Sequence, residues 1–121
     1  MAVDMFMEKQ TDFIQNSVML QVDGTIVNSS RIKSIIESVG FWRDFYPMHE
    51  WIVDNVQLGE DDQGRYWLTP ENIKDLADHL TIVKEWCPEW GDQCDNTISQ
   101  LHNYLNEDNI TPFSAFYYQG I

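Results

Sequence analysis

The sequence predicts an α+β fold in which three or four helices pack on a small, mostly antiparallel sheet. Three observations predict it. Apolar residues recur at helical spacing through the middle of the chain, β-forming runs lie near both ends, and one run is split by Asp23-Gly24. A chain of 121 residues without an internal repeat or linker fits a single domain, residues 1–121.

The first elements of the chain are expected to be strands. Residues 2–7 form a short apolar run interrupted by Asp4, which suits a buried strand, although a helix also fits it. Residues 18–22 and 25–27 flank Asp23-Gly24, and this arrangement is the strongest short signal of a β-hairpin. We expect the terminal strands and this hairpin to form one sheet.

Two helices are expected before the acidic turn. In the first helix, Ser29 and Ser30 suit the N-terminal cap, and Gly40 suits the C-terminal end. Its apolar face is formed by Ile32, Ile35, Ile36 and Val39. In the second, Pro47 suits the first turn, and the stripe is Met48, Trp51, Ile52 and Val56.

Asn55 falls inside the apolar stripe of the second helix, about 60° from Ile52 at 100° per residue. An amide in that position needs a hydrogen-bond partner if it is buried. Both a structural hydrogen bond and a role in a site explain it, and the structural bond is the simpler interpretation.

The best-marked helix follows an acidic turn at residues 59–64 and a short strand at residues 66–68. Thr69 suits the cap, Pro70 the first helical position and Glu71 the positive end of the helix. Its expected apolar stripe is Ile73, Leu76, Ala77, Leu80 and Val83.

Beyond this helix, residues 86–91 contain Pro88 and Gly91 and are expected to form a compact loop. A third helix should follow, with Asp95 or Asn96 as its cap, residues 106–109 at its end, and Ile98, Leu101 and Leu105 on its apolar face. The aromatic run at residues 113–118 is expected to be a final strand that joins the N-terminal strands.

The charge restricts the partners. Twenty acidic and seven basic residues give a net charge of −13, which argues against direct binding of nucleic acid or of an anionic membrane. Residues 1–59 hold 8 acids and 4 bases (−4), and residues 60–121 hold 12 acids and 3 bases (−9). No apolar run approaches the roughly 18 residues of a membrane span, and no signal peptide is evident. We expect a soluble, cytoplasmic protein with a basic or uncharged partner.

The residues also carry a family resemblance that reaches from end to end. The matching positions are residues 1–7, Gly40, Phe41, Trp42, Arg43, His49, Trp51, Asn55, Val56, Gln57, Gly59, Asp61, Asp62, Gly64, Tyr66 and residues 116–119. Together they resemble a family of small uncharacterised proteins carried by phages and prophages. The resemblance implies a phage-encoded accessory protein in a host cytoplasm, and it implies no particular chemistry.

Two weak metal signals are present, and we predict no cofactor or metal. Glu60, Asp61 and Asp62 place three carboxylates in one turn, which suits Ca²⁺ or Mg²⁺, but a solvated turn in which Asp62 bonds its own amides explains them as well. The donors His79, Cys87, Cys94 and His102 suit zinc chemically. Helical spacing of about 12 Å separates the members of each His and Cys pair, however. Free thiols are favoured over a disulfide in a cytosolic setting.

A polar site is the main candidate for chemistry. His49 has Asn55, Asp61 and Asp62 as potential orienting partners for proton transfer. A histidine at the margin of an apolar stripe is more often structural. The chain also lacks nucleophile-elbow, Walker and dinucleotide motifs. An enzyme is therefore the weaker interpretation.

The favoured function is binding of a host or phage protein, which would include covering a basic, nucleic-acid-binding surface. Trp67, Trp86 and Trp90 are candidate interface anchors, and Glu60, Asp61 and Asp62 are candidate acidic contacts, although a solvated acidic surface explains the same charge. A small-molecule binder or enzyme around His49 is the alternative, and a virion or scaffold subunit that forms a homo-oligomer is a further one.

Overall fold

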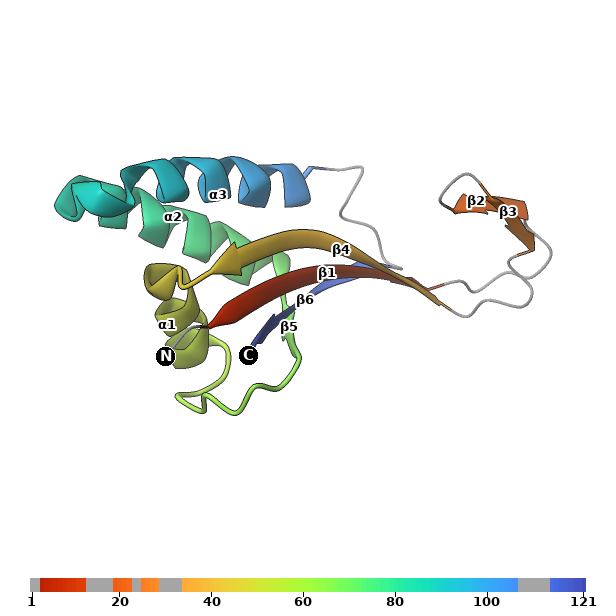
Figure 1. The fold of residues 1–121 in the computed structure, drawn as a ribbon, viewed down its shortest axis with the longest axis horizontal. Helices are drawn as coiled ribbons and strands as arrows, with labels where there is room; N and C mark the ends of the chain where they lie inside the picture. The colour runs from red at the N-terminus through yellow and green to blue at the C-terminus, as the bar shows by residue number, and fades with distance from the viewer. Residues whose placement is uncertain (1–2, 13–18, 23–24, 29–33, 107–113) are drawn as a thin grey trace.

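The computed structural model describes residues 3–12, 19–22, 25–28, 34–106 and 114–121. Within them it has an α+β fold with a four-stranded antiparallel sheet and three α-helices (Figure 1), which confirms the predicted class. The elements are β1 (Asp4–Asp12), β2 (Met19–Val22), β3 (Thr25–Asn28), β4 (Ser34–Arg43), α1 (Tyr46–Asn55), β5 (Tyr66–Leu68), α2 (Pro70–Trp86), a 3₁₀ turn (Pro88–Trp90), α3 (Gly91–Tyr104) and β6 (Ser114–Gly120).

The first and last strands of the chain pair at the centre of the main sheet. The strand order is β4-β1-β6-β5, and Met7 of β1 lies opposite Tyr118 of β6. The prediction that the aromatic tail joins the N-terminal strand is therefore confirmed. At the sheet edge, β5 pairs with β6 through Tyr66, Trp67 and Leu68, which confirms the short strand after the acidic turn.

The expected hairpin forms, but its place in the sheet was wrong. β2 and β3 pair antiparallel in a separate two-stranded sheet, and the Asp23-Gly24 turn lies outside the described residues. The hairpin follows β1, which has no free edge, because the edge strands of the main sheet are β4 and β5. One edge of β1 is paired with β4 and the other with β6.

The helix expected at residues 29–40 was also wrong, because residues 34–43 form β4. This strand pairs with β1 from Asp4 opposite Arg43 to Asp12 opposite Ser34. Long-range pairing of β-branched residues outweighs the local helical spacing here. Gly40 is not a helix stop, and a Cβ on it would lie 2.5 Å from Cη2 of Trp42. The proposed caps Ser29 and Ser30, with Ile32, lie outside the described residues.

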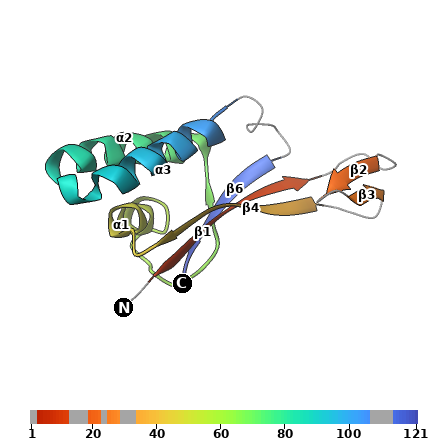
Figure 2. The same ribbon diagram turned by 45° about the horizontal axis from the view of Figure 1, so that its top comes forward.

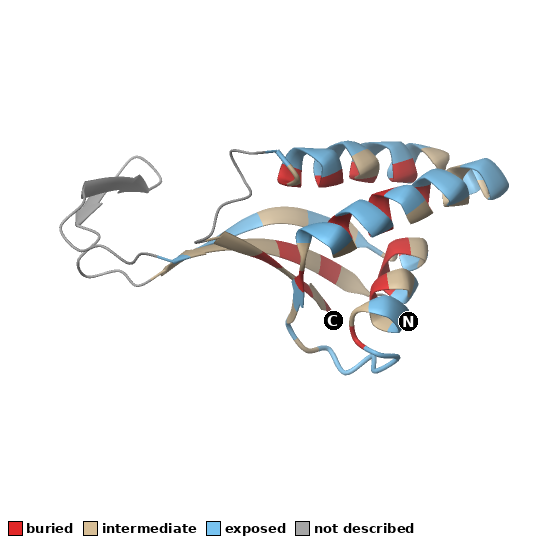
Figure 3. Ribbon diagram, turned by 180° about the vertical axis from the view of Figure 1, so that it is seen from behind, coloured by how far each residue is buried: buried red, intermediate tan, exposed pale blue. Residues whose placement is uncertain are grey.

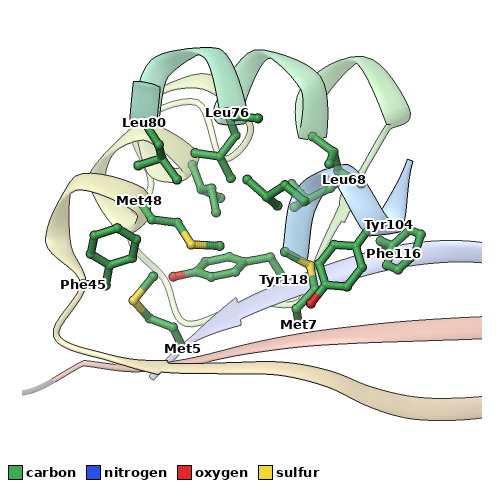
Figure 4. Packing of buried hydrophobic residues seen from close by; sticks show 14 of the residues in the cluster. Met5, Met7, Phe45, Met48, Leu68, Leu76, Leu80, Tyr104, Phe116 and Tyr118 are labelled. Carbon is green, nitrogen blue, oxygen red and sulfur yellow. The ribbon is translucent and has the colours of Figure 1, made fainter. Parts of the chain in front are cut away.

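The three helices cover one face of the main sheet, as the views in Figures 1 and 2 agree. Their buried residues face the sheet and one another in Figure 3. Met5, Met7 and Tyr118 of the sheet point toward α1 and α2 in Figure 4. The buried hydrophobic core is Met5, Met7, Phe45, Met48, Ile52, Leu68, Ile73, Leu76, Ala77, Leu80, Cys94, Leu101, Tyr104, Phe116 and Tyr118.

Helix α2 follows its prediction closely. Thr69 caps it, with its Oγ1 accepting from the Asn72 amide at 3.1 Å, and Asn72 Oδ1 accepts from the Thr69 amide at 3.0 Å. This reciprocal pair is a capping box that the sequence analysis did not identify. The predicted stripe is confirmed, since four of its members are buried and Val83 packs against them.

Helix α1 also agrees with its prediction, since Pro47 lies in the first turn and both Met48 and Ile52 are buried. The start of α3 was placed too late. The helix begins at Gly91, directly after the 3₁₀ turn, so Asp95 and Asn96 lie inside it rather than at its cap. Among the described residues, no helix has the length and apolarity needed to cross a membrane.

Candidate functional site

The most connected polar cluster joins α1, β6 and the acidic loop through His49. This side chain lies on the sheet side of α1 and is only 5% exposed. Its Nδ1 lies 2.6 Å from the hydroxyl oxygen of Tyr118, and its Nε2 lies 3.2 Å from Oδ2 of Asp61. Both ring nitrogens therefore have a partner, and the imidazole links a buried hydroxyl to a carboxylate that is 58% exposed.

Tyr118 is the buried end of this hydrogen-bonded chain. It is fully buried, and desolvation raises the pKa of its hydroxyl, with the charge of Asp61 adding to the effect. In the neutral ring, the carboxylate of Asp61 can only accept, so Nε2 carries the hydrogen and donates to it. Nδ1 then accepts from the hydroxyl of Tyr118.

Gly120 makes room for the histidine at the end of β6. A Cβ at this position would lie 2.6 Å from Cε1 of His49 and 2.9 Å from the hydroxyl oxygen of Tyr118. Distances below 3.0 Å require a shift of the neighbouring atoms. The close approach of the imidazole to the strand therefore depends on a residue without a side chain.

A pocket of about 390 Å³ opens beside the His49 cluster. Its walls include Tyr46, His49, Glu50, Asp61 and Gln63. Chemically, the cluster holds the imidazole in one orientation and offers a carboxylate at the pocket. Transfer of a proton to a ligand from Nε2 would require Asp61 to move away, because that nitrogen is already bonded.

The structure brings together only part of the predicted polar site. Asp62 bonds within its own turn, accepting from the Gly64 amide at 2.9 Å and from the Tyr66 hydroxyl at 2.7 Å. These two bonds hold the pKa of Asp62 below its ordinary value, the Tyr66 bond contributing most. Asn55 is exposed and donates to the Trp51 carbonyl at 2.9 Å, which is the structural hydrogen bond expected of it.

The residues of the two metal hypotheses are placed as follows. In the described part of the chain, no group of three or more His, Cys, Asp or Glu side chains is arranged to hold a metal ion. Cys94 is buried and Cys87 half-buried, and both are free thiols. Burial raises the pKa of the Cys94 thiol, and burial lowers the pKa of His79. His102 is exposed on α3.

The three candidate interface tryptophans differ in exposure. Trp67 is 57% exposed on β5, and Trp86 is 81% exposed at the end of α2. Trp90 is partly buried, and its ring lies 5.6 Å from that of Phe45 in the core. Two of the three therefore present their rings to solvent, and the third belongs partly to the core.

Trp67 belongs to a larger aromatic surface, the open sheet face, which we define by Phe6, Phe41, Trp67 and Tyr117. Phe41 lies opposite Phe6, and Trp67 lies opposite Tyr117. Phe6 and Tyr117 alternate with buried Met5, Met7, Phe116 and Tyr118, so their rings point away from the helices. The rings of Phe6 and Phe41 are 5.3 Å apart.

Arg65 packs on the open sheet face and is held there by contacts with two strands. Its guanidinium carbon lies 3.7 Å from the centre of the Tyr117 ring. Its Nε donates to Glu8 at 3.2 Å, and its Nη2 donates to Gln10 at 3.1 Å. These contacts fix the arginine against the strands, so the aromatic side chains around it sit on a preorganised surface.

Sequence reasoning identified His49, Asp61 and Trp67 but missed Tyr118, Gly120, Phe6, Phe41 and Tyr117, which complete these features. Tyr118 and Gly120 reach His49 only through the pairing of β6 with β1. Phe6 and Phe41 can be assigned to one surface only when it is known that the helices cover the opposite face of the sheet. Phe6 between Met5 and Met7 was a usable signal, because strand alternation separates it from its neighbours.

Comparisons of the chain with protein-family models, with curated proteins and with solved structures found no match.

Proposed function

We propose that this protein binds another protein through the open sheet face. The observation that carries the proposal is the group of four aromatic side chains on the sheet face opposite the helices. Phe41 is 56% and Trp67 57% exposed, and Phe6 and Tyr117 are half-buried. Exposed apolar surface of this kind is typical of interaction sites, and tryptophan and tyrosine are frequent interface anchors.

The charge indicates the kind of partner. With a net charge of −13, the protein attracts basic surfaces over a distance of about 8 to 10 Å at moderate ionic strength. Glu60, Asp61 and Asp62 are exposed in the loop that leads into β5, the strand of Trp67. A partner with basic residues around an apolar patch would meet both features. The resemblance to phage-encoded accessory proteins supports a host or phage protein in the host cytoplasm as this partner.

The test is capture of the partner from a host lysate by the wild type and by two double variants. Phe41→Ser with Trp67→Ser removes two exposed rings from the open sheet face. Leu58→Ser with Ile82→Ser removes two apolar side chains that are also exposed, at 86% and 55%, but lie outside this face. All four positions are exposed, so both variants should fold.

We expect the open-face variant to lose the partner by tenfold or more and the control variant to keep it. We also expect the wild-type complex to weaken as salt is raised, because its electrostatic part is screened. Full binding by the open-face variant, or equal loss in both variants, would contradict the proposal.

A small-molecule site beside His49 is the second candidate. It is favoured by the pocket of about 390 Å³ and by the fixed imidazole and carboxylate at its wall. Mass spectrometry of the native protein would favour this candidate if it found a bound small molecule that His49→Ala releases. A homo-oligomer of high mass in the same measurement would favour the virion or scaffold alternative.

A further inference from the structure

A second hollow lies between α1 and the end of α2. It shares Glu50 with the pocket beside His49, and none of the residues of the open sheet face lines it. Its volume is about 420 Å³. The indole rings of Trp51 and Trp90 and the imidazole of His79 contribute to its walls. The ring centres of Trp51 and His79 lie 6.3 Å apart and the rings are tilted by 30°, so these two aromatic side chains are neighbours in the hollow.

The polar part of this hollow is acidic. Glu50 and Asp54 both line it, and they lie one helical turn apart on the same side of α1. Its lining contains no lysine or arginine, and among the described residues neither acid belongs to one of the four ion pairs. Two like charges at this spacing repel each other, and a cation between them would relieve the repulsion.

We propose that this hollow, the Trp51–Trp90 pocket, binds the cationic side chain of an arginine or lysine presented by a protein segment. Aromatic faces attract a cation through their electron-rich centres, and the attraction strengthens where water is partly excluded. The two carboxylates supply the countercharge at the rim. Anions and neutral apolar groups fit this combination less well, because either would leave the carboxylates uncompensated.

His79 fits the same chemistry. It is half-buried in the wall, and burial lowers its pKa, which favours the neutral ring near pH 7. A neutral imidazole does not repel a bound cation. The site is independent of the open sheet face, so a partner would reach it with a separate segment.

The probe is Nα-acetyl-arginine methylamide, with the citrulline compound as an uncharged match of the same shape. Binding would be followed by ¹⁹F NMR on protein that contains 5-fluorotryptophan, with each of the five resonances assigned by a Trp→Phe variant. We expect saturable shifts of the Trp51 and Trp90 resonances with arginine and no saturable shift with citrulline. Trp67 and Trp86 should stay unchanged.

Two double variants separate a built pocket from general attraction to an acidic protein. Glu50→Gln with Asp54→Asn removes the pocket carboxylates, and Asp75→Asn with Asp78→Asn makes the same change of net charge on the exposed side of α2. The first should weaken arginine binding by about fivefold or more, and the second by less than about twofold. Saturation by citrulline, no saturation by arginine, or equal weakening in both variants would overturn the proposal.

Discussion

His49 illustrates how single residues connect distant parts of this chain. Its two hydrogen bonds join Tyr118, 69 positions later, to Asp61 in the acidic loop. Sequence reasoning identified the histidine and the aspartate, because both lie in the central segment that carries the family resemblance. It did not identify Tyr118, since the pairing of β1 with β6 brings that residue under α1, and local sequence does not encode this pairing.

Gly120 is the residue at which a small change should have the largest effect on this cluster. The substitution Gly120→Ala places a methyl group 2.6 Å from Cε1 of His49, so we expect the free energy of unfolding to fall by about 1 to 3 kcal/mol. Urea denaturation measures it. Gly91→Ala is the control, because nothing lies within 4 Å of its Cβ, and it should be neutral or stabilising by up to about 1 kcal/mol. Equal stability of the two variants would contradict the packing described for His49.

The two buried tyrosines predict a loss of stability at alkaline pH. Burial raises the pKa of Tyr104 from 10.0 to about 12 and raises that of Tyr118 further. Between these values and 10.0, the unfolded tyrosines ionise and the folded ones stay protonated. The folded state therefore has its full stability below pH 10 and loses it as the pH rises above 10.

Denaturation curves at a series of pH values from about 8 to 11 measure this loss. Tyr118→Phe should flatten the fall in unfolding free energy above pH 10, because one of the two groups no longer titrates. An identical slope in wild type and Tyr118→Phe would show that Tyr118 ionises as easily in the folded state as in the unfolded one.

At the scale of elements, local sequence signals predicted the helix α2 correctly, but they failed for β4, whose structure depends on pairing with a distant strand. The cap at Thr69 and the stripe from Ile73 to Val83 belong to α2 itself, so that helix was predictable. β4 was not. The register with β1 passes from Met7 opposite Gly40 to Glu8 opposite Ser38, so Val39 is an extra residue. This bulge interrupts the alternation of side chains between the two sheet faces. The apolar residues Ile36 and Val39 are spaced three positions apart, which is also the spacing expected in a helix.

The capping box gives a prediction for α2. Thr69→Ala removes the oxygen that accepts from the Asn72 amide, so the free energy of unfolding should fall by about 1 kcal/mol. Thermal denaturation measures this change. Thr81→Ala, on the exposed side of the same helix, should differ from wild type by about 0.5 kcal/mol or less. A loss at position 69 no larger than the change at position 81 would contradict a stabilising contribution of the cap.

At the scale of the whole molecule, the helices form a single layer, and this arrangement leaves one sheet face to solvent. The sequence predicted Trp67 as an exposed anchor, but Phe6 and Phe41 could not be assigned to the same surface. Their placement depends on which face the helices cover and on β4 being a strand. The acidic charge was readable from composition alone, and it favours a basic partner independently of the fold.

The most direct test of the proposed binding through the open sheet face is site-specific photocrosslinking in cells that express the protein. A benzoylphenylalanine replaces Phe41 in one version of the protein and Ile82, on the exposed side of α2, in the other. We predict that position 41 gives one dominant protein adduct, that Trp67→Ser abolishes it, and that position 82 gives none. The same adduct from both positions, or one from position 82 alone, would contradict binding through the open sheet face.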